Sequence, residues 1–151
     1  MNRKLKMLFE ERDNDIYSVE SWKSIKEAVD IMNKNHIGAL IVFDEKKKVA
    51  GIVTERDVMC LLANTDQLCG HVKVSEVMTP KEKLHIATGE CSIEEMMVSM
   101  TEKNIRHIPV ITDDGILRGV VSMRDIIKML LNAAKAEVEQ LNKFITGKYP
   151  A

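Results

Sequence analysis

Cysteine is scarce in this sequence, and the few cysteines are poorly placed for cross-linking or metal binding. Only Cys60, Cys69 and Cys91 occur, far apart and without a Cys-x-x-Cys pair. An odd, scattered set gives neither a disulfide framework nor a zinc site, and inert cysteines are the stronger interpretation. The pattern therefore predicts a protein of a reducing compartment, which we expect to be the cytoplasm.

The sequence also lacks an excess of one charge and a long apolar run. The 22 Lys and Arg residues nearly balance the 23 Asp and Glu residues, for a net charge of -1, and this removes the basic footprint of a general nucleic-acid binder. No stretch of 18 apolar residues exists, and the basic segment 1–9 lacks the apolar core of a signal peptide. We therefore expect neither a membrane span nor a nucleic-acid partner.

What the sequence does contain is an internal repeat without gaps. At 45% hydrophobic and 30% charged, 151 residues suffice for one compact unit or for two small halves that share a core. Many residues of the segment 24–64 recur 68 positions later in the chain. A period this long in two copies indicates a duplicated domain whose halves pack about a pseudo-two-fold axis. The identical pairs include Ser24/Ser92, Ile25/Ile93, Glu27/Glu95, Met32/Met100, Ile37/Ile105, Val42/Val110, Gly51/Gly119, Val53/Val121, Arg56/Arg124 and Asp57/Asp125.

Each copy predicts the same order of elements: strand, helix, strand, strand, helix. The first helix begins at a serine with a glutamate three residues later, Ser24 with Glu27 and Ser92 with Glu95, which is the spacing of a capping box. A short apolar run then predicts a buried strand, and after a turn a second strand leads into the last helix. The fold class is therefore mixed α/β (α+β). The buried and returning strands are expected at 37–43 and 49–53 in the first copy and at 108–111 and 116–121 in the second.

Three segments lie outside the repeat. Leu5, Leu8 and Phe9 have helical spacing and predict an amphipathic N-terminal helix, and residues 74–80 read as a short helical linker that a proline stops. The last helix continues to about residue 145. We therefore place the N-terminal helix and the first copy in residues 1–70, and the linker, the second copy and the helical extension in residues 71–151.

Two nearly identical stretches, 51–57 and 119–125, organise the chain. Each reads glycine, two β-branched residues, a hydroxyl residue, two variable residues and an aspartate. The β-branched pair favours the end of a buried strand, the Thr or Ser favours a helix N-cap, and the aspartate falls in the first helical turn. Backbone N–H groups, a hydroxyl and a carboxylate therefore converge at a strand-to-helix corner, which suits the binding of a sugar diol beside a phosphate.

These residues resemble the cystathionine-β-synthase (CBS) domain family, in the tandem arrangement called a Bateman module. Besides the two corners, the resemblance is carried by Arg106-His107-Ile108-Pro109-Val110-Ile111, by Val77-Met78-Thr79-Pro80 between the copies, and by Ile37-Gly38-Ala39-Leu40-Ile41-Val42. It implies two tandem CBS domains, a cleft with two pseudo-symmetric sites, and adenosine-containing ligands such as AMP, ATP, NAD(H) or S-adenosylmethionine. The segment 38–41 lacks the Arg-His and proline of the second copy, so we expect unequal phosphate binding at the two sites.

The resemblance also implies which residues bind the ligand. Asp57 and Asp125 would accept ribose hydroxyls, and Thr54 and Ser122 would hold sugar or phosphate oxygens. The resemblance pairs other residues with the corner of the opposite copy: Arg106 and His107 with Thr54 and Asp57, and Ile37, Gly38 and Ala39 with Ser122 and Asp125. Arg56 and Arg124 are a separate case, because a cation at a helix start is unfavourable for the helix dipole and so suggests a negative ligand nearby.

Each of these assignments has a structural alternative. A carboxylate in the first turn of a helix can merely complement the helix dipole, an effect of about 0.3–1 kcal/mol. Arg106 and His107 could form an exposed strand edge, and Arg56 and Arg124 could be solvated. The occurrence of Asp57 and Asp125 in matched context in both copies favours the ligand interpretation for the aspartates.

Three functions compete at this point. A regulatory module that senses adenine nucleotides and signals to a partner protein of unknown identity comes first, and an interaction scaffold with vestigial sites comes second. An enzyme that uses Asp57 or Asp125 with His107 comes last, because the sequence pairs no nucleophile with an oriented base and spaces no histidines as metal ligands. We therefore expect no catalytic residue, no metal site and no catalytic cofactor.

The last helix predicts self-association. Its apolar residues recur at three- and four-residue spacing beyond what one small domain needs to cover, and the N-terminal Leu5, Leu8 and Phe9 add a second apolar stripe. Two-fold pairing buries such surface most simply, so we expect a homodimer with residues 133–145 in its interface. The apolar residues of the last helix are Leu130, Leu131, Ala134, Val138 and Leu141.

Overall fold

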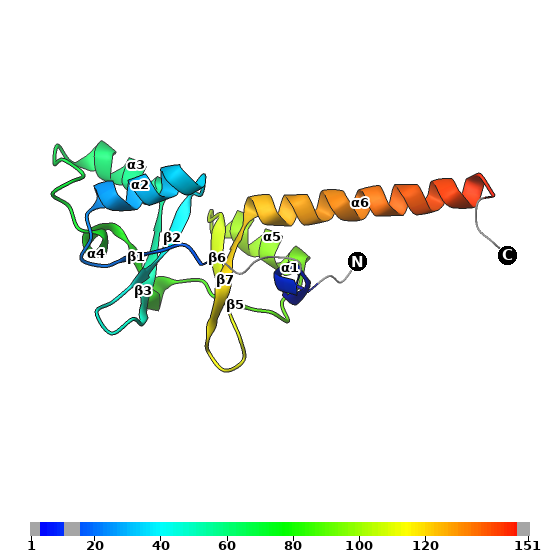
Figure 1. Ribbon diagram of the computed structural model, residues 1–151, viewed down its shortest axis with the longest axis horizontal. Helices are drawn as coiled ribbons and strands as arrows, with labels where there is room; N and C mark the ends of the chain where they lie inside the picture. The colour runs from blue at the N-terminus through cyan, green and yellow to red at the C-terminus, as the bar shows by residue number, and fades with distance from the viewer. Residues whose placement is uncertain (1–3, 11–15, 148–151) are drawn as a thin grey trace. The chain divides into compact units, whose positions relative to one another are not determined.

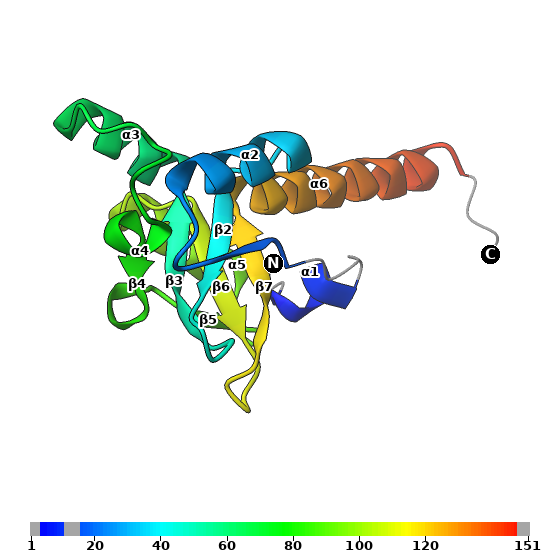
Figure 2. The same cartoon turned by 60° about the vertical axis from the view of Figure 1, so that its left-hand side comes forward.

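The structure, a computed structural model, describes residues 4–10 and 16–147 (Figures 1 and 2). The chain divides into two compact units: Asn14–Ile86, which we call the first-repeat unit, and Met1–Asp13 together with Ala87–Ala151, which we call the second-repeat unit. Each is a mixed α/β unit, as the sequence predicts.

In the first-repeat unit, a four-stranded sheet has the order β1-β2-β3-β4. Strand β1 runs parallel to β2, whereas β3 is antiparallel to both of its neighbours. The centre of β2 is wholly buried because Leu40, Ile41 and Val42 are each 0% exposed, so the short apolar run is a core strand as expected. The elements are β1 (Ser18–Glu20), α2 (Ile25–Asn35), β2 (Ala39–Phe43), β3 (Val49–Thr54), α3 (Glu55–Asn64), α4 (Val74–Val77), β4 (Thr79–Pro80) and the 3-10 helix η1 (Lys81–Lys83).

The second-repeat unit has a three-stranded sheet of order β5-β6-β7, with β5 parallel and β7 antiparallel to β6. Its register repeats that of the first: Ala39 pairs with Thr54, and His107 pairs with Ser122 at the positions 68 residues later. The two copies therefore share a fold down to individual residue pairs. The elements are α1 (Lys6–Glu10), β5 (Ala87–Thr88), α5 (Ile93–Glu102), β6 (His107–Ile111), β7 (Leu117–Ser122) and α6 (Met123–Ile145).

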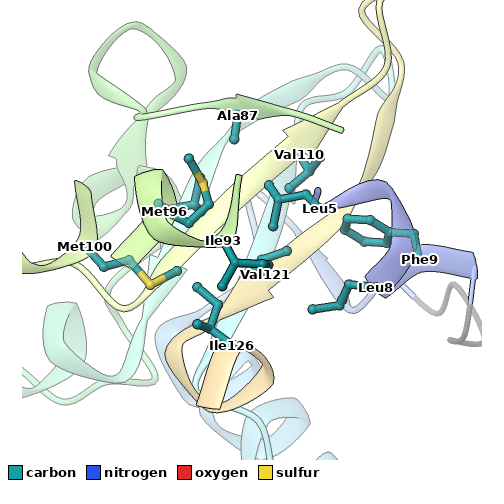
Figure 3. Packing of buried hydrophobic residues seen from close by; sticks show 11 residues of the cluster. Leu5, Leu8, Phe9, Ala87, Ile93, Met96, Met100, Val110, Val121 and Ile126 are labelled. Carbon is teal, nitrogen blue, oxygen red and sulfur yellow. The ribbon is translucent and has the colours of Figure 1, made fainter. Parts of the chain in front are cut away.

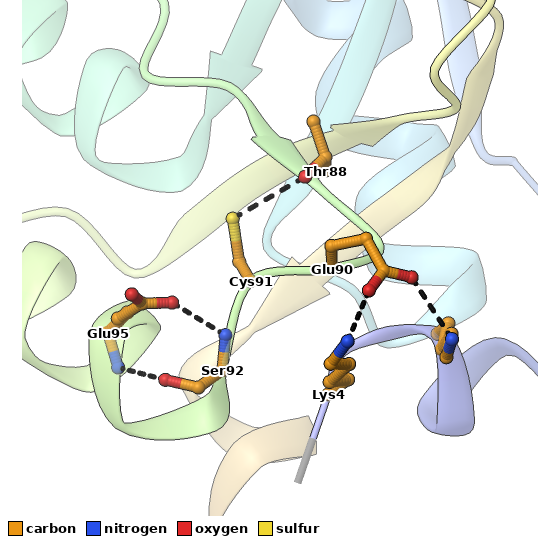
Figure 4. A network of polar contacts seen from close by, with 7 residues as sticks. Lys4, Thr88, Glu90, Cys91, Ser92 and Glu95 are labelled. Carbon is orange, nitrogen blue, oxygen red and sulfur yellow. Dashed lines mark hydrogen bonds and ion pairs between the residues drawn. The ribbon is translucent and has the colours of Figure 1, made fainter. Parts of the chain in front are cut away.

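Both predicted capping boxes are present. The amide of Ser24 donates to Glu27 Oε2 at 2.9 Å, and the amide of Ser92 donates to Glu95 Oε2 at 2.7 Å. In return, each serine hydroxyl accepts from the glutamate amide, so helices α2 and α5 begin where local sequence chemistry sets them. Figure 4 shows the Ser92–Glu95 pair.

Each core is completed by a segment that precedes the other copy in the sequence. In the first-repeat unit, the Val74 amide donates to the Lys23 carbonyl at 2.8 Å. In the second-repeat unit, the Leu5 amide donates to the Cys91 carbonyl, the position equivalent to Lys23, at 3.0 Å. Val74 and Leu5 are both 0% exposed, so the two segments have the same role in their units. Glu90 also forms ion pairs with Lys4 and Lys6 that hold the N-terminal segment in place (Figure 4).

The two units defined by packing differ from the domain boundaries expected from the sequence, which were residues 1–70 and 71–151. Leu5, Leu8 and Phe9 join the core of the second-repeat unit (Figure 3), and residues up to Ile86 pack with the first repeat. The reason is that an amphipathic helix of five residues is stable only on a core that needs its apolar face. The N-terminal stripe is therefore covered within its own unit, which corrects our expectation that it is free for association.

Much of the apolar surface of helix α6 lies outside the core of its unit, as expected from the sequence. Ile126 and Ala133 are buried, whereas Leu131, Val138 and Leu141 are 56%, 55% and 57% exposed. Every residue from Ala134 to Ile145 is exposed, and α6 extends well beyond the sheet of its own unit (Figure 1). Among the described residues, none of the helices has the length and apolar character needed to span a membrane.

Candidate functional site

The first strand-to-helix corner is a closed hydrogen-bonded loop. Oδ2 of Asp57 accepts from the Thr54 amide at 2.7 Å and from the Thr54 hydroxyl at 2.9 Å. The Asp57 amide donates to Thr54 Oγ1 at 3.4 Å, so Thr54 is the N-cap of α3 and Asp57 is the third helical residue. The predicted cap is confirmed, and the aspartate also completes a capping box.

The second corner repeats this arrangement at the start of α6. Oδ2 of Asp125 accepts from the Ser122 amide at 2.9 Å and from the Ser122 hydroxyl at 2.7 Å. The Asp125 amide donates back to Ser122 Oγ at 3.2 Å. Because the same oxygen accepts the same two groups in both units, the carboxylate is held in a defined orientation at both corners.

These bonds limit what each corner can offer a ligand. A hydroxyl has one proton, and those of Thr54 and Ser122 point to the aspartates, so in this state they can accept from a ligand but cannot donate to a phosphate oxygen. The amide of the first helical residue is used too: Glu55 donates to the Gly38 carbonyl at 3.0 Å, and Met123 donates to the Arg106 carbonyl at 2.9 Å. This network uses most of the hydroxyl and backbone N–H donors of the corners, and the phosphate contact expected there stays a prediction.

The Asp57 carboxylate keeps acceptor capacity. A carboxylate has about four lone-pair sites, and the capping box uses two of them on Oδ2. All the described hydrogen bonds of the Asp57 side chain go to Oδ2, so Oδ1 can accept from a ligand hydroxyl. Since Asp57 and Asp125 are both half-buried, their carboxylates are fixed by the protein and still reachable.

The start of the central strand lies beside the corner of its own unit. Ala39 is opposite Thr54, and His107 is opposite Ser122. The structure thus brings Ile37, Gly38 and Ala39 next to the first corner, and Arg106 and His107 next to the second. The pairings with the opposite copy's corner, which the resemblance implies, remain predictions.

The two corners carry different charges. A Cβ added at Gly38 would stand 3.1 Å from Glu55 Cδ, so the Glu55 carboxylate lies directly over that glycine. The equivalent positions in the second unit are Arg106 and Met123, a cation and a neutral residue. Arg124 and Arg106 are exposed, whereas Arg56 and His107 are half-buried. The unequal phosphate binding expected from the sequence stays a prediction.

The glycine of each corner stretch has a packing role that the sequence analysis missed. A Cβ at Gly51 would stand 2.2 Å from the Thr79 carbonyl oxygen, and one at Gly119 would stand 2.7 Å from Phe9 Cε1. In each unit the glycine therefore lets the core-completing segment approach β3 or β7 closely. The spacing of Thr54 to Asp57 and Ser122 to Asp125 also matches a capping box with aspartate in place of glutamate, so that role could have been predicted.

The described residues give little support for a metal site or for a functional role of His36. No group of three or more His, Cys, Asp or Glu side chains within residues 4–10 and 16–147 could hold a metal ion. His36 ends α2 in the left-handed conformation with a φ of 54°, which gives it a structural place at the helix C-cap.

Comparison with known proteins points to one family. The model of the CBS domain matches residues 14–64 and 74–132. The chain is 35% identical over 128 residues to "CBS domain-containing protein CBSX3, mitochondrial" from Arabidopsis thaliana, which covers 83% of this chain. The match spans 62% of that relative's length, so its remaining part has no counterpart in the match.

Solved structures agree with this result. The CBS-domain containing protein ATU1752 from Agrobacterium tumefaciens superposes with a TM-score of 0.78 at 30% identity, covering 85% of this chain and 93% of that one. The CBS domain pair of protein MJ0100, solved in complex with 5'-methylthioadenosine and S-adenosylmethionine, gives a TM-score of 0.73 at 25% identity and covers 88% of this chain and 99% of its own.

Proposed function

Because the chain belongs to the CBS domain family and carries two such domains in tandem, we propose that it is a regulatory module that binds an adenosine-containing ligand and passes its occupancy to a partner protein or to its own oligomer. The observation that carries the proposal is the pair of aspartates held in the same orientation by the same two bonds. The candidate ligands are AMP, ATP, NAD(H) and S-adenosylmethionine. The bound adenosine compounds of the MJ0100 domain pair support this choice.

In this proposal, the aspartates recognise the ribose. A hydroxyl that donates to a carboxylate forms a charge-assisted hydrogen bond, which is about twice as strong as a neutral one. Oδ1 of Asp57 has two lone pairs, which is enough for both hydroxyls of a ribose. The capping box holds the carboxylate in position before the ligand arrives, and this lowers the entropic cost of binding.

The charged side chains recognise whatever the ribose carries. Arg106, His107, Arg56 and Arg124 would bind phosphate or carboxylate groups, because the corner amides and hydroxyls are occupied. Ile37, Gly38 and Ala39 would frame the adenine. Arg106 and His107 would act on the ligand that Asp57 holds.

The second candidate is a scaffold whose ligand sites are vestigial. The hydrogen bonds at both corners favour this candidate, because a complete capping box accounts for the presence of an aspartate without any ligand. Both candidates are compatible with a homodimer, which we propose from the exposed apolar stripe of α6, and we propose a cytoplasmic location from the cysteine pattern. Subcellular fractionation tests the location, since the Arabidopsis relative is named as mitochondrial.

A binding experiment separates the two candidates. We expect isothermal titration with AMP, adenosine, ATP, NADH and S-adenosylmethionine to give saturable heat with at least one compound, and mass spectrometry to detect the same class in freshly purified protein. Absence of heat with every compound would support the scaffold.

A matched pair of arginine variants then tests the role of charge. We expect Arg106→Ala to weaken AMP binding by about tenfold relative to adenosine, because the contact is with phosphate. Arg118→Ala, which removes an exposed arginine of β7 outside the corner, should change neither. Equal losses for AMP and adenosine would contradict the assignment of Arg106.

A further inference from the structure

Helix α6 carries a stripe of exposed apolar residues whose spacing alternates between four and three. Its members are Ile127, Leu131, Ala134, Val138, Leu141 and Ile145. Ile127 is 49% exposed and Ile145 is 82% exposed, so the stripe faces outward along its whole length. We call these six residues the α6 seam.

The seam is separate from the face by which α6 packs on its own unit. Ile126 and Ala133 are buried, and Met129 and Leu130 pack against the core. One and two turns beyond Ala133, the same face continues with Glu137 and Gln140, which are exposed. The core-facing stripe therefore ends at Ala133, whereas the seam begins before that residue and continues to Ile145.

The period of the seam identifies the kind of contact that it makes. The members of the seam recur seven positions apart in two series, 127–134–141 and 131–138–145, which is the heptad of a two-stranded coiled coil, whereas a helix that covers a globular core has a wider stripe. Leu131, Val138 and Ile145 occupy the a positions, and Ile127, Ala134 and Leu141 occupy the d positions. In the C-terminal half of the seam, the β-branched Val138 and Ile145 at a, with Leu141 at d, favour two parallel strands, whereas Ile127 at d with Leu131 at a does not add to that preference.

We propose that the α6 seam pairs with the α6 seam of a second copy of this chain in a parallel two-stranded coiled coil. The proposal rests on the homodimer included in the proposed function and specifies its contact. A second copy is the occupant because the repeat is self-complementary: each apolar layer meets its own equivalent. The flanking residues also favour this pairing.

The charged residues beside the seam favour a parallel over an antiparallel arrangement of the two α6 helices. Lys135 occupies an e position, Glu137 a g position and Asn142 the next e position. In a parallel pair, Glu137 faces Asn142 of the other copy, and no like charges meet. In an antiparallel pair with full overlap, Lys135 would face Lys135 and Glu137 would face Glu137, which is repulsive.

The size of the seam suits a modest but specific association. Residues 127–145 span about 27 Å of helix, and pairing would bury roughly 1,000 Å² over the two copies, the lower limit for a specific interface. We therefore expect the chain to be dimeric at a protein concentration of tens of micromolar, which requires a dissociation constant in that range or below it.

The test measures the mass of the full-length chain in solution by light scattering after size exclusion, at tens of micromolar. The wild type should be dimeric. Leu141→Glu should raise the dissociation constant of the dimer about tenfold or more, because two carboxylates would face each other in an apolar layer. Val138→Glu should behave in the same way. Gln140→Glu, which adds the same charge outside the seam, should remain dimeric.

The substituted positions are exposed, so the units should keep their fold, and thermal unfolding checks this. A dimeric wild type with equally dimeric Leu141→Glu and Val138→Glu variants would overturn the coiled coil alone. A monomeric wild type would overturn both the coiled coil and the homodimer. Titration of Leu141→Glu with the adenosine compounds distinguishes these failures from failure of ligand binding, because the corners are unchanged.

The parallel arrangement of the two helices is tested separately by oxidative disulfide cross-linking. A parallel pair brings Leu141 next to Leu141 of the other copy, so Leu141→Cys should form a covalent dimer that the wild type, with its native cysteines, does not form. Gln140→Cys is the matched control and should cross-link much less. A Leu141→Cys variant that dimerises without cross-linking would overturn the parallel arrangement.

Discussion

Oδ2 of Asp57 accepts hydrogen bonds from both the amide and the hydroxyl of Thr54, at 2.7 and 2.9 Å. The same oxygen of Asp125 accepts from the same groups of Ser122. One carboxylate thus starts a helix and, in the function that we propose, binds a ribose. A substitution there must affect both stability and binding, and the two effects have to be measured against a matched cap.

Asp57→Ala should lower the free energy of unfolding by about 1 kcal/mol, the usual cost of a lost cap, and should also abolish ligand heat at that site. The matched control is Glu95→Ala, which removes the equivalent bond to Ser92 at the start of α5. It should cost similar stability, measured by urea unfolding, and leave the binding heat unchanged. If both variants lost binding equally, the loss would come from helix stability rather than from a ribose contact.

Asp57→Asn should separate charge from capping. The amide oxygen can still accept at the cap, so we expect a smaller loss of stability than for alanine. Binding should still weaken by about tenfold, because neutral acceptors give weaker hydrogen bonds to hydroxyls than carboxylates do. Urea unfolding and calorimetric titration of the same protein sample measure both effects, and undiminished affinity would argue against the ribose role.

Gly51→Ala should be among the most destabilising single substitutions in the chain. The new methyl group would stand 2.2 Å from the Thr79 carbonyl oxygen, a backbone atom that cannot move without disturbing the β3–β4 pairing. We expect a loss of about 3 kcal/mol or more, at the upper end for overpacking. Gly70→Ala, with nothing within 4 Å of its Cβ, is the control and should be nearly neutral in thermal unfolding.

Leu5→Ala should destabilise the second-repeat unit by about 2–5 kcal/mol, the usual range for a buried leucine. Leu5 is 0% exposed in that core, whereas Met7 in the same segment is 45% exposed, so Met7→Ala is the matched control. Hydrogen exchange can assign the effect. Protection should fall in β6 and β7 more than in β2 and β3, and the reverse order would contradict the assignment of the N-terminal segment to the second-repeat unit.

Acid should weaken the attachment of the N-terminal segment. Hydrogen bonds from Lys4, and then from Lys6, hold the pKa of Glu90 below its ordinary value of 4.5. The ion pairs therefore contribute fully above that value and are lost as the pH falls through the lowered pKa. Glu90→Gln should remove this part of the acid destabilisation in thermal melts between pH 7 and pH 3, whereas Glu45→Gln in the β2–β3 turn should not. Because Glu90 is exposed, the effect should be small and should shrink in high salt.

Local signals in the sequence account for most of the elements and for the repeat. Ser24 with Glu27 and Ser92 with Glu95 mark helix starts, because a cap is a contact between residues three apart. The strand 39–43 follows from an apolar run that is too short for a helix. The corner residues Thr54, Asp57, Ser122 and Asp125 were likewise predictable, since each corner is closed by bonds between neighbours in the chain.

Assignment of the N-terminal segment required the tertiary structure. Leu5, Leu8 and Phe9 predict an amphipathic helix wherever they lie, because periodicity specifies a face and not the core that covers it. Their place with the second repeat depends on contacts to Cys91 and Gly119, more than 80 residues away.

The sequence by itself determined that the domain is duplicated, where its helices begin and which residues form the two corners, because these features depend on short-range chemistry and on a repeat visible in the letters. Only the tertiary structure decided which unit the N-terminal segment completes, and that the apolar residues of α6 divide into a buried face ending at Ala133 and an exposed seam reaching Ile145. The core that covers a segment and the burial of a side chain depend on where groups lie in space, and spacing along the chain does not specify that.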